Sequence, residues 1–298
     1  MLLKNLMLKL KSTLFILILI INIFVVFNLF SSDAKAVDGE NHFQFISRQC
    51  KPDENEAVES VPQSPPLVID DPSTPGCNNW EINVLVDADL THSDQSWELP
   101  LFDVNYGFGD NIELTFEAPN SKTYSAESSP SGFTHSKTGI KIEFYENPDT
   151  SEEMAFYPQV DFTVLSSNPQ QNLDQPTGSI YSLPFLYSRK VGENSHGDVS
   201  LNANIGYNIS TRSDTQDSLS AELALGAPLS NHLALMAELT TEQAVVSDNQ
   251  GTRDQQTGFN VGIMHKAFKW LLWYGSVGKS LYSSDQKDHT FVVTGIRL

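Results

Sequence analysis

The stretch LFDVNYGFGDNIELTFEAP, residues 101–119, alternates apolar and polar side chains on both sides of a Gly-Asp pair. Successive side chains of a β-strand point to opposite faces, so Ile112, Leu114, Phe116 and Ala118 form one apolar wall and the residues between them form a polar wall. Gly109-Asp110 tolerates the positive φ of a tight turn. The stretch is therefore predicted to be a β-hairpin, and its pattern recurs up to the last residue.

Twelve such runs follow one another from Trp80 onward, and outside the first 36 residues no stretch has a convincing helical period. Their predicted bounds are Trp80–Asp89, Trp97–Phe108, Asn111–Pro119, Thr138–Tyr145, Glu153–Leu165, Ser179–Arg189, Val199–Asn208, Ser218–Ala227, His232–Thr240, Thr257–Lys266, Trp270–Leu281 and His289–Leu298. Most even-numbered runs are followed by short links, with a somewhat longer one at Val191–Asp198, whereas long polar links follow the third, fifth, seventh and ninth runs. Alternating short turns and long loops are typical of outer-membrane barrels, whose turns face the periplasm. We expect an all-β fold, namely a closed antiparallel transmembrane β-barrel of about twelve strands.

A soluble sandwich would show the same alternation, with the apolar wall as its core. Most runs, however, reach the roughly 9–11 residues that a tilted strand needs to cross a bilayer. Aromatic residues also recur near the run ends, as in interfacial girdles, at Trp80, Trp97, Tyr106, Tyr145, Tyr187, Tyr207, Trp270, Trp273 and Tyr282. Both features favour the membrane barrel. Pro100, Pro158 and Pro184 fall inside predicted strands and are expected at bulges or strand starts, because proline lacks the backbone donor.

Residues 1–36 have the pattern of a signal peptide, although a retained membrane anchor is the alternative reading. Basic residues begin the segment, residues 14–30 are almost wholly apolar, and Ala34-Lys35-Ala36 has the small-x-small form of a cleavage site. Residues 37–79 are acidic and contain six prolines between Pro52 and Pro75, which predicts a mobile periplasmic tether. The barrel domain is then expected to span residues 80–298.

The chain is strongly acidic, with 37 acidic against 18 basic residues, and the leader holds four Lys but one Asp. Such a surface repels nucleic acid, which is excluded as the main partner. Barrel proteins keep their charges in loops and lumen, so acidity does not exclude lipid, and outer-membrane lipid and a small-molecule solute are the expected partners.

Cys50 and Cys77 are the only cysteines. In an oxidising compartment they can form a disulfide, but sequence spacing cannot establish its geometry, and two free thiols remain the alternative. Two cysteines without clustered histidines form no zinc site, and neither a metal nor a cofactor is expected.

The polar wall supplies the candidate lumen-lining residues. They are Asp87, Asp103, Glu113, Glu117, Lys141, Glu143, Asp161, Asn202, Asn204, Glu222 and Glu238. These side chains either form a cation-preferring lumen or pair with interior bases and water, and the residues alone leave both readings open. The residues expected to face lipid include Leu114, Phe116, Leu201, Ile205, Leu223 and Leu235.

Residues 99–111, LPLFDVNYGFGDN, carry a family resemblance, together with WEIN at 80–83, YPQV at 157–160, APLS at 227–230 and LMAEL at 235–239. They resemble the outer-membrane transporter family named after the MetA pathway of phenol degradation, over about residues 74–298. The resemblance implies a small transporter barrel in the outer membrane of a Gram-negative bacterium, without catalytic residues. Two departures are Ser136–Gly139, where the family has a Gly-Asp run, and Leu298, where such barrels usually end in an aromatic residue.

We therefore expect a porin-like, passive channel for small solutes, aromatic or hydrophobic ones included, with a bias towards cations. A structural or binding barrel plugged by its tether is the alternative. An outer-membrane hydrolase is the less favoured one, because Ser195-His196 and His232 lie in no nucleophile-elbow motif. The sequence leaves the solute, the pore radius and the oligomeric state open.

Overall fold

The computed structural model describes residues 50, 69–124, 131–133, 135–164, 177–212, 215–246, 253–268 and 270–298. The chain divides into two units, residues 1–41 and 42–298, and every described residue belongs to the second. The predicted signal peptide and most of the predicted tether lie outside the described residues. Within the described part, no helix is long and apolar enough to cross a membrane.

The described chain is built of antiparallel strands. They are β1 (Trp80–Leu90), β2 (Gln95–Gly107), β3 (Ile112–Tyr124), β4 (Ser131–Gly132), β5 (His135–Asn147), β6 (Glu152–Phe156), β7 (Gln159–Thr163), β8 (Ser179–Ser182), β9 (Phe185–Asn194), β10 (Gly197–Ser210), β11 (Ser218–Ser230), β12 (Leu233–Ala244), β13 (Gln255–Phe268), β14 (Leu271–Ser283) and β15 (Thr290–Arg297).

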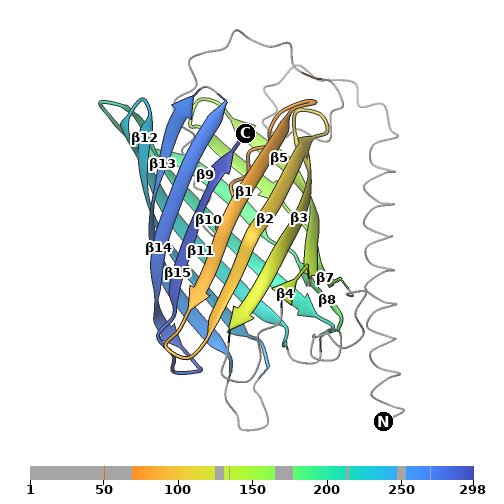
Figure 1. Cartoon of the computed structure of the whole chain (residues 1–298). Helices are drawn as coiled ribbons and strands as arrows, with labels where there is room; N and C mark the ends of the chain where they lie inside the picture. Colours follow the sequence, from red (N-terminus) through yellow and green to blue (C-terminus); the bar gives the residue numbers. More distant parts are fainter. Residues whose placement is uncertain are drawn as a thin grey trace, which may run out of the picture. The chain divides into compact units, whose positions relative to one another are not determined.

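The sheet closes on itself (Figure 1). Strand β1 pairs with both β2 and β15, and the ladder continues through β3 and β5 on one side and through β14 to β10 on the other. Strand β5 pairs with β7 and then with β6, so these two are halves of one membrane strand. Strands β8 and β9 form a second such pair, because both bind β10. With the two-residue β4 outside the ring, the barrel has twelve strands, and the predicted fold is confirmed.

The prolines mark the irregularities of the barrel, as predicted. Pro158 separates β6 from β7, and Pro184 separates β8 from β9. Pro100 lies where the register between β2 and β3 shifts, between Glu98 and Leu101, and its bond to Leu99 is cis. Each proline thus occupies a position at which the ladder needs no backbone donor.

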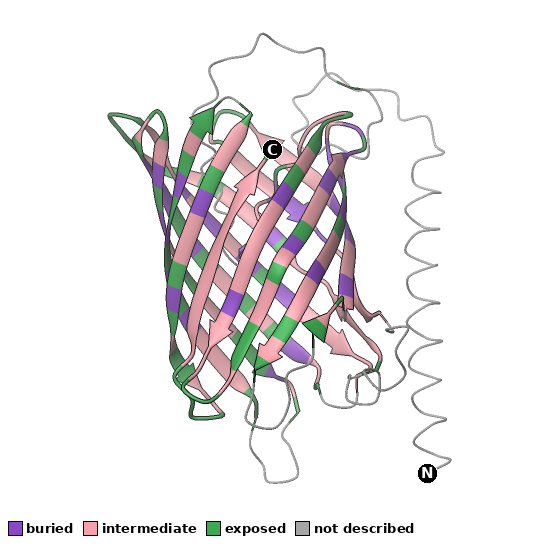
Figure 2. Ribbon diagram, viewed as in Figure 1, coloured by how far each residue is buried: buried purple, intermediate pink, exposed green. Residues whose placement is uncertain are grey.

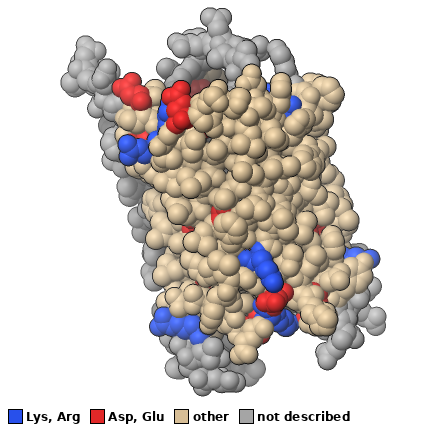
Figure 3. All heavy atoms as spheres, turned by 90° about the vertical axis from the view of Figure 1, so that its left-hand side faces the viewer, with Lys and Arg blue, Asp and Glu red and all other residues tan. Residues whose placement is uncertain are grey.

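Buried and exposed residues alternate along several strands (Figure 2), and the exposed ones include many large apolar side chains. On β13, for example, Asn260 and Met264 are buried while Phe259, Val261 and Ile263 are exposed. On the face drawn in Figure 3, charged residues gather towards the two ends, and uncharged residues make up most of the band between them. An apolar belt between charged rims is what a bilayer requires of a barrel exterior.

The links that follow β2, β5, β9, β11 and β13 lie at one end of the barrel, here named the turn end. The β1–β2 and β14–β15 links lie at the opposite end, here named the loop end. The link predicted at Val191–Asp198 is shorter than expected, since the ladder between β9 and β10 continues to Asn194 and Gly197. Gly197 closes this turn with a φ of 139°.

Part of the inner wall is apolar, which the polar-wall pattern did not suggest. Ala234, Met236, Met264 and Tyr274 form a buried cluster, and Leu85, Leu272 and Val293 pack against it. In the last strand Val292 and Val293 are adjacent, so alternation alone does not tell which of the two faces inward. Val293 packs against this cluster, so Val293 is the valine that faces inward.

Candidate functional site

Residues Ile69–Pro75, here named the plug segment, lie inside the barrel. Ile69 is 2% exposed and Pro72 is also fully buried. Hydrogen bonds tie the segment to strands of the wall: Ile69 N donates to Glu238 Oε2 (2.9 Å), Asn204 Nδ2 donates to the Asp70 carbonyl (2.9 Å), and Lys141 Nζ donates to the Ser73 carbonyl (3.2 Å). These partners come from β12, β10 and β5, so the segment is held by well-separated parts of the wall. Residues 69–75 were expected to belong to a mobile tether, yet the structure docks them in the lumen.

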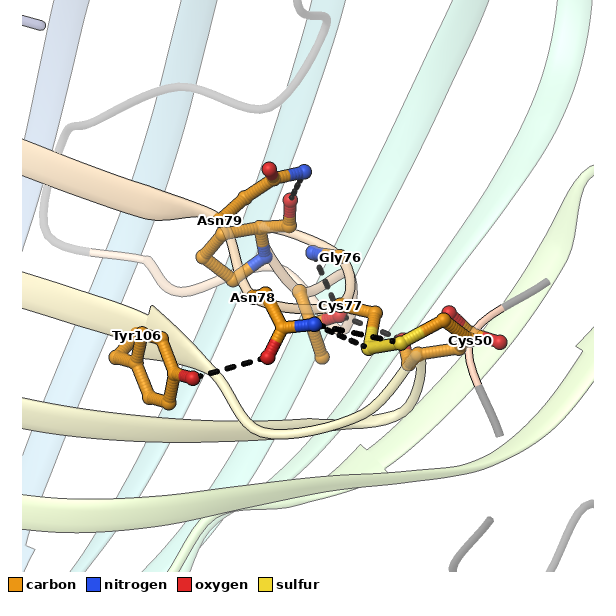
Figure 4. The surroundings of a disulfide bond; sticks show 9 residues. Cys50, Gly76, Cys77, Asn78, Asn79 and Tyr106 are labelled. Carbon is orange, nitrogen blue, oxygen red and sulfur yellow. Dashed lines mark hydrogen bonds between the residues drawn. A yellow bond between two sulfur atoms is a disulfide. The ribbon is translucent and has the colours of Figure 1, made fainter. Parts of the chain in front are cut away.

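A disulfide between Cys50 and Cys77 lies next to the plug segment (Figure 4). Asn78 Nδ2 lies 3.5 Å and 3.4 Å from the two sulfur atoms, and Tyr106 Oη donates to Asn78 Oδ1 (3.1 Å). The last residues before β1 also follow the end of β2 closely, since a Cβ on Gly107 would lie 1.7 Å from the Gly76 carbonyl oxygen. The disulfide thus joins Cys50 to the chain immediately before β1.

A cavity of about 330 Å³, here named the slot, separates the plug segment from the wall formed by β15, β1, β2, β3 and β5. Eight carboxylates line it: Asp70, Asp71, Glu81, Asp87, Glu98, Asp103, Glu113 and Glu117. The basic residues that line it are Lys137, Lys141 and Arg297. Formal charge along the slot is therefore strongly negative.

Each of these three basic residues has a carboxylate partner. Lys137 Nζ lies 2.9 Å from Glu117 Oε2, Lys141 Nζ lies 3.2 Å from Glu113 Oε2, and Arg297 Nη1 lies 3.1 Å from Glu81 Oε2. Asp103 instead accepts hydrogen bonds from the amides of Asn83 (2.9 Å) and Asn105 (3.1 Å). The three ion pairs therefore neutralise the basic residues of the slot, and the other carboxylates that line it have no basic partner among these three residues.

The structure gives the predicted lumen residues different surroundings. Asp87, Asp103, Glu113, Glu117 and Lys141 line the slot. Asn204 and Glu238 hold the plug segment, and Glu222 Oε2 accepts from Asn204 Nδ2 at 3.2 Å. Asn202 is buried. Asp161 pairs with Arg212 at 2.8 Å, and Glu143 is half-buried outside the slot lining.

Several slot residues were missed from sequence. Glu81 and Lys137 have the same parity as the predicted Asp87 and Lys141 on their strands, and strict alternation would have included them. Glu98 could not be found that way, because the extra residue at the Leu99-Pro100 irregularity reverses the parity of β2.

The residues considered for a hydrolase lie in turns. Ser195 and His196 form the link between β9 and β10, and His232 lies between β11 and β12. The backbone amides of His196 and His232 donate to Asn194 Oδ1 and Ser230 Oγ respectively.

At the loop end, the β1–β2 link meets the β14–β15 link. Lys287 Nζ lies 2.7 Å from Asp94 Oδ2. His289 bridges two carboxylates, with Nδ1 2.9 Å from Asp89 Oδ1 and Nε2 3.1 Å from Asp285 Oδ2. These contacts join the ends of the first and last strands.

Titration of His289 should show a raised pKa. Burial acts to lower the pKa of this imidazole, but its hydrogen bonds to Asp89 and Asp285 prevail, so the pKa lies above the usual 6.5. Because the folded pKa is raised, the charged ring stabilises the contact fully below the unfolded value, and this contribution is lost as the pH rises through the folded pKa. An NMR titration of the ring checks this, and Asp285→Asn should lower the midpoint. A wild-type midpoint at or below 6.5 would contradict the expectation.

Comparison with known proteins gives one family match. The family model described as "Putative MetA-pathway of phenol degradation" matches residues 69–286. The match begins at Ile69 and therefore includes the plug segment. No curated protein sequence matches the chain significantly.

Solved structures share the fold. An outer membrane channel from Pseudomonas putida F1 is 13% identical, with a TM-score of 0.64, over 78% of this chain and 98% of that chain. The KdgM porin in complex with disordered oligogalacturonate is 11% identical, with a TM-score of 0.47, over 72% of this chain and 97% of that one. The NanC porin is 8% identical, with a TM-score of 0.49, over 72% and 98%. At such identities the similarity concerns the fold alone.

Proposed function

Because the chain belongs to the family of the MetA pathway of phenol degradation and folds as an outer-membrane barrel, we propose that it is a passive channel for small solutes, with the slot as its route. The slot lies between the plug segment and the wall, and it is lined from Glu81 to Asp87 on β1 and from Glu98 to Asn105 on β2. Inward-facing residues of both strands thus line one continuous space.

A cation bias follows from the charges of the slot. The observation that carries it is the excess of eight carboxylates over three basic residues, each of which is already paired with a carboxylate. In a narrow space with low-dielectric walls, such a field concentrates cations and excludes anions. The family description suggests an aromatic solute. The negative field would repel such a solute only when it has ionised to an anion.

Asp87 and Asp103 are the carboxylates to change, because neither forms an ion pair with the three basic residues of the slot. The double substitution Asp87→Asn and Asp103→Asn should reduce the cation preference, measured as the reversal potential in a planar bilayer under a KCl gradient. The wild-type preference should also weaken with salt, as the Debye length falls from about 10 Å at 0.1 M to 3 Å at 1 M.

Glu193→Gln is the matched control, because it removes one carboxylate from an exposed position near the turn end. It should leave the reversal potential unchanged. An anion-selective wild type, or an unchanged preference in the double variant, would refute the proposal.

A barrel closed by its tether is the second candidate, and the contacts of the plug segment favour it. The open channel and the plugged barrel can be distinguished by measuring conductance before and after the plug segment is removed.

A further inference from the structure

Acidic and apolar residues follow one another in bands along the slot, as the pairing of β1 with β2 shows. Across β1 and β2, Asn83 pairs with Asp103, Leu85 with Leu101, and Asp87 with Glu98. All six residues line the slot. A band of two leucines therefore lies between two acidic bands, the first at Asp103 and the second at Asp87 and Glu98.

The apolar band extends beyond the two leucines. Leu101 pairs on its other side with Pro119, which is fully buried. The two acidic bands are four residues apart along β1, a separation of roughly 13 Å at about 3.3 Å per residue. A ligand that matched the lining would carry positive charge at both ends and methylene groups between them.

The first acidic band has acceptor atoms without donors. Asp103 Oδ2 accepts from both Asn83 and Asn105, whereas Asp103 Oδ1 has no hydrogen-bond partner among the described residues. Asn105 lines the slot and is 7% exposed, and its Oδ1 also lacks a donor in the described part of the chain. Buried oxygens without donors are costly, and an ammonium group supplies three N–H donors.

The basic residues near both acidic bands are already paired with carboxylates, which leaves each band able to bind a cation. Lys137 and Arg297 are the basic residues nearest in the ladder, and they pair with Glu117 and Glu81 respectively. In the second band, Glu98 Oε1 lies 3.3 Å from His135 Nε2, and Asp87 has no ion pair among the described residues. Each band therefore offers one aspartate, Asp103 or Asp87, that forms no ion pair with a basic side chain of the described residues.

We propose that the slot binds a linear aliphatic diamine, with one ammonium group at Asp103 and Asn105, the other at Asp87 and Glu98, and the methylene chain against Leu85 and Leu101. The inference rests on the proposed function, because the amine enters the barrel by the same route. The slot volume of about 330 Å³ is at the lower end of ligand pockets. The length of the ligand is set by the distance between the two acidic bands.

Calorimetric titration of the folded full-length barrel in detergent tests the site with three probes. Diaminooctane should bind at least tenfold more tightly than octylamine, which has one ammonium group, and than diaminobutane, which is too short to reach both bands. Equal affinity for diaminooctane and octylamine would overturn the proposal, and this comparison requires no variant.

Variants then locate the two ends. Asp103→Asn and Asp87→Asn should each reduce diaminooctane affinity to that of octylamine, while Glu193→Gln should leave it unchanged. Unchanged diaminooctane affinity in either aspartate variant would place the ligand elsewhere and refute the site. A cation-selective channel that binds no diamine refutes this inference alone, whereas diamine binding without cation selectivity refutes the proposed function alone.

Discussion

Removal of the plug segment should raise the single-channel conductance severalfold. The segment fills the lumen beside the slot, where Ile69 and Pro72 are buried and the Asp70 and Ser73 carbonyls accept hydrogen bonds from the wall. Conductance scales with the cross-section that ions can use, so emptying this part of the lumen has the largest effect of any change considered. A variant that lacks residues 37–75 and carries Cys77→Ser, recorded in a planar bilayer against the wild type, provides the measurement.

The disulfide supplies the control for that experiment. In Cys50→Ser/Cys77→Ser, the hydrogen bonds from the plug segment to Glu238, Asn204 and Lys141 can all remain. Conductance should therefore stay close to that of the wild type. If deletion of the segment leaves conductance unchanged, the slot is not the narrowest part of the route. A wild type that conducts no ions, combined with a deletion variant that does, favours the plugged barrel over the open channel.

The strands could be predicted because each needs only a local pattern. On β10, Ser200, Asn202, Asn204 and Gly206 are buried and the residues between them are not, as the alternation predicts. A one-residue slip would turn every side chain to the other face, so the pattern also fixes the facing wherever a strand is regular. Where β2 contains an extra residue, that inference fails, and Glu98 was missed for this reason.

A plug formed by the tether was only an alternative from the sequence, and the residues that dock could not be predicted, because their burial depends on partners far away in sequence. Ile69 binds Glu238, 169 residues later, and Asn204 binds Asp70 across 134 residues. Its own composition, with Asp70, Asp71 and Pro72, is typical of a solvated linker. The docking of the plug segment depends on the barrel wall, because side chains there form hydrogen bonds with its backbone groups.

The apolar inner cluster could not be predicted for a similar reason. Met236 and Met264 lie on the face that also carries Glu238 and Asn260, so each strand has a mixed inner wall. The sequence cannot tell which part of that wall the plug segment covers. Packing of Tyr274 and Val293 beside the slot emerges only once the barrel is closed.

Arginine at Leu223 should destabilise the folded barrel by roughly 2–4 kcal/mol if the residue lies at the bilayer midplane. Leu223 is 46% exposed on the outer face of β11, in register with Ala203 and Leu239 on the neighbouring strands. The guanidinium would have to leave water for hydrocarbon, and no acidic group lies directly across the ladder from it. Urea unfolding in phospholipid vesicles measures the loss.

Glu222→Arg, one residue earlier, is the matched control for the same side chain. Glu222 is half-buried on the opposite face of β11, where its carboxylate accepts from Asn204, and Glu238 and Glu242 lie on the next strand. An arginine there can pair with these carboxylates, so the loss of stability should be far smaller than at Leu223. Equal losses at the two positions would mean that β11 has no lipid face, and the facing of the whole barrel would then have to be reassigned, because the ladder fixes β11 relative to every other strand.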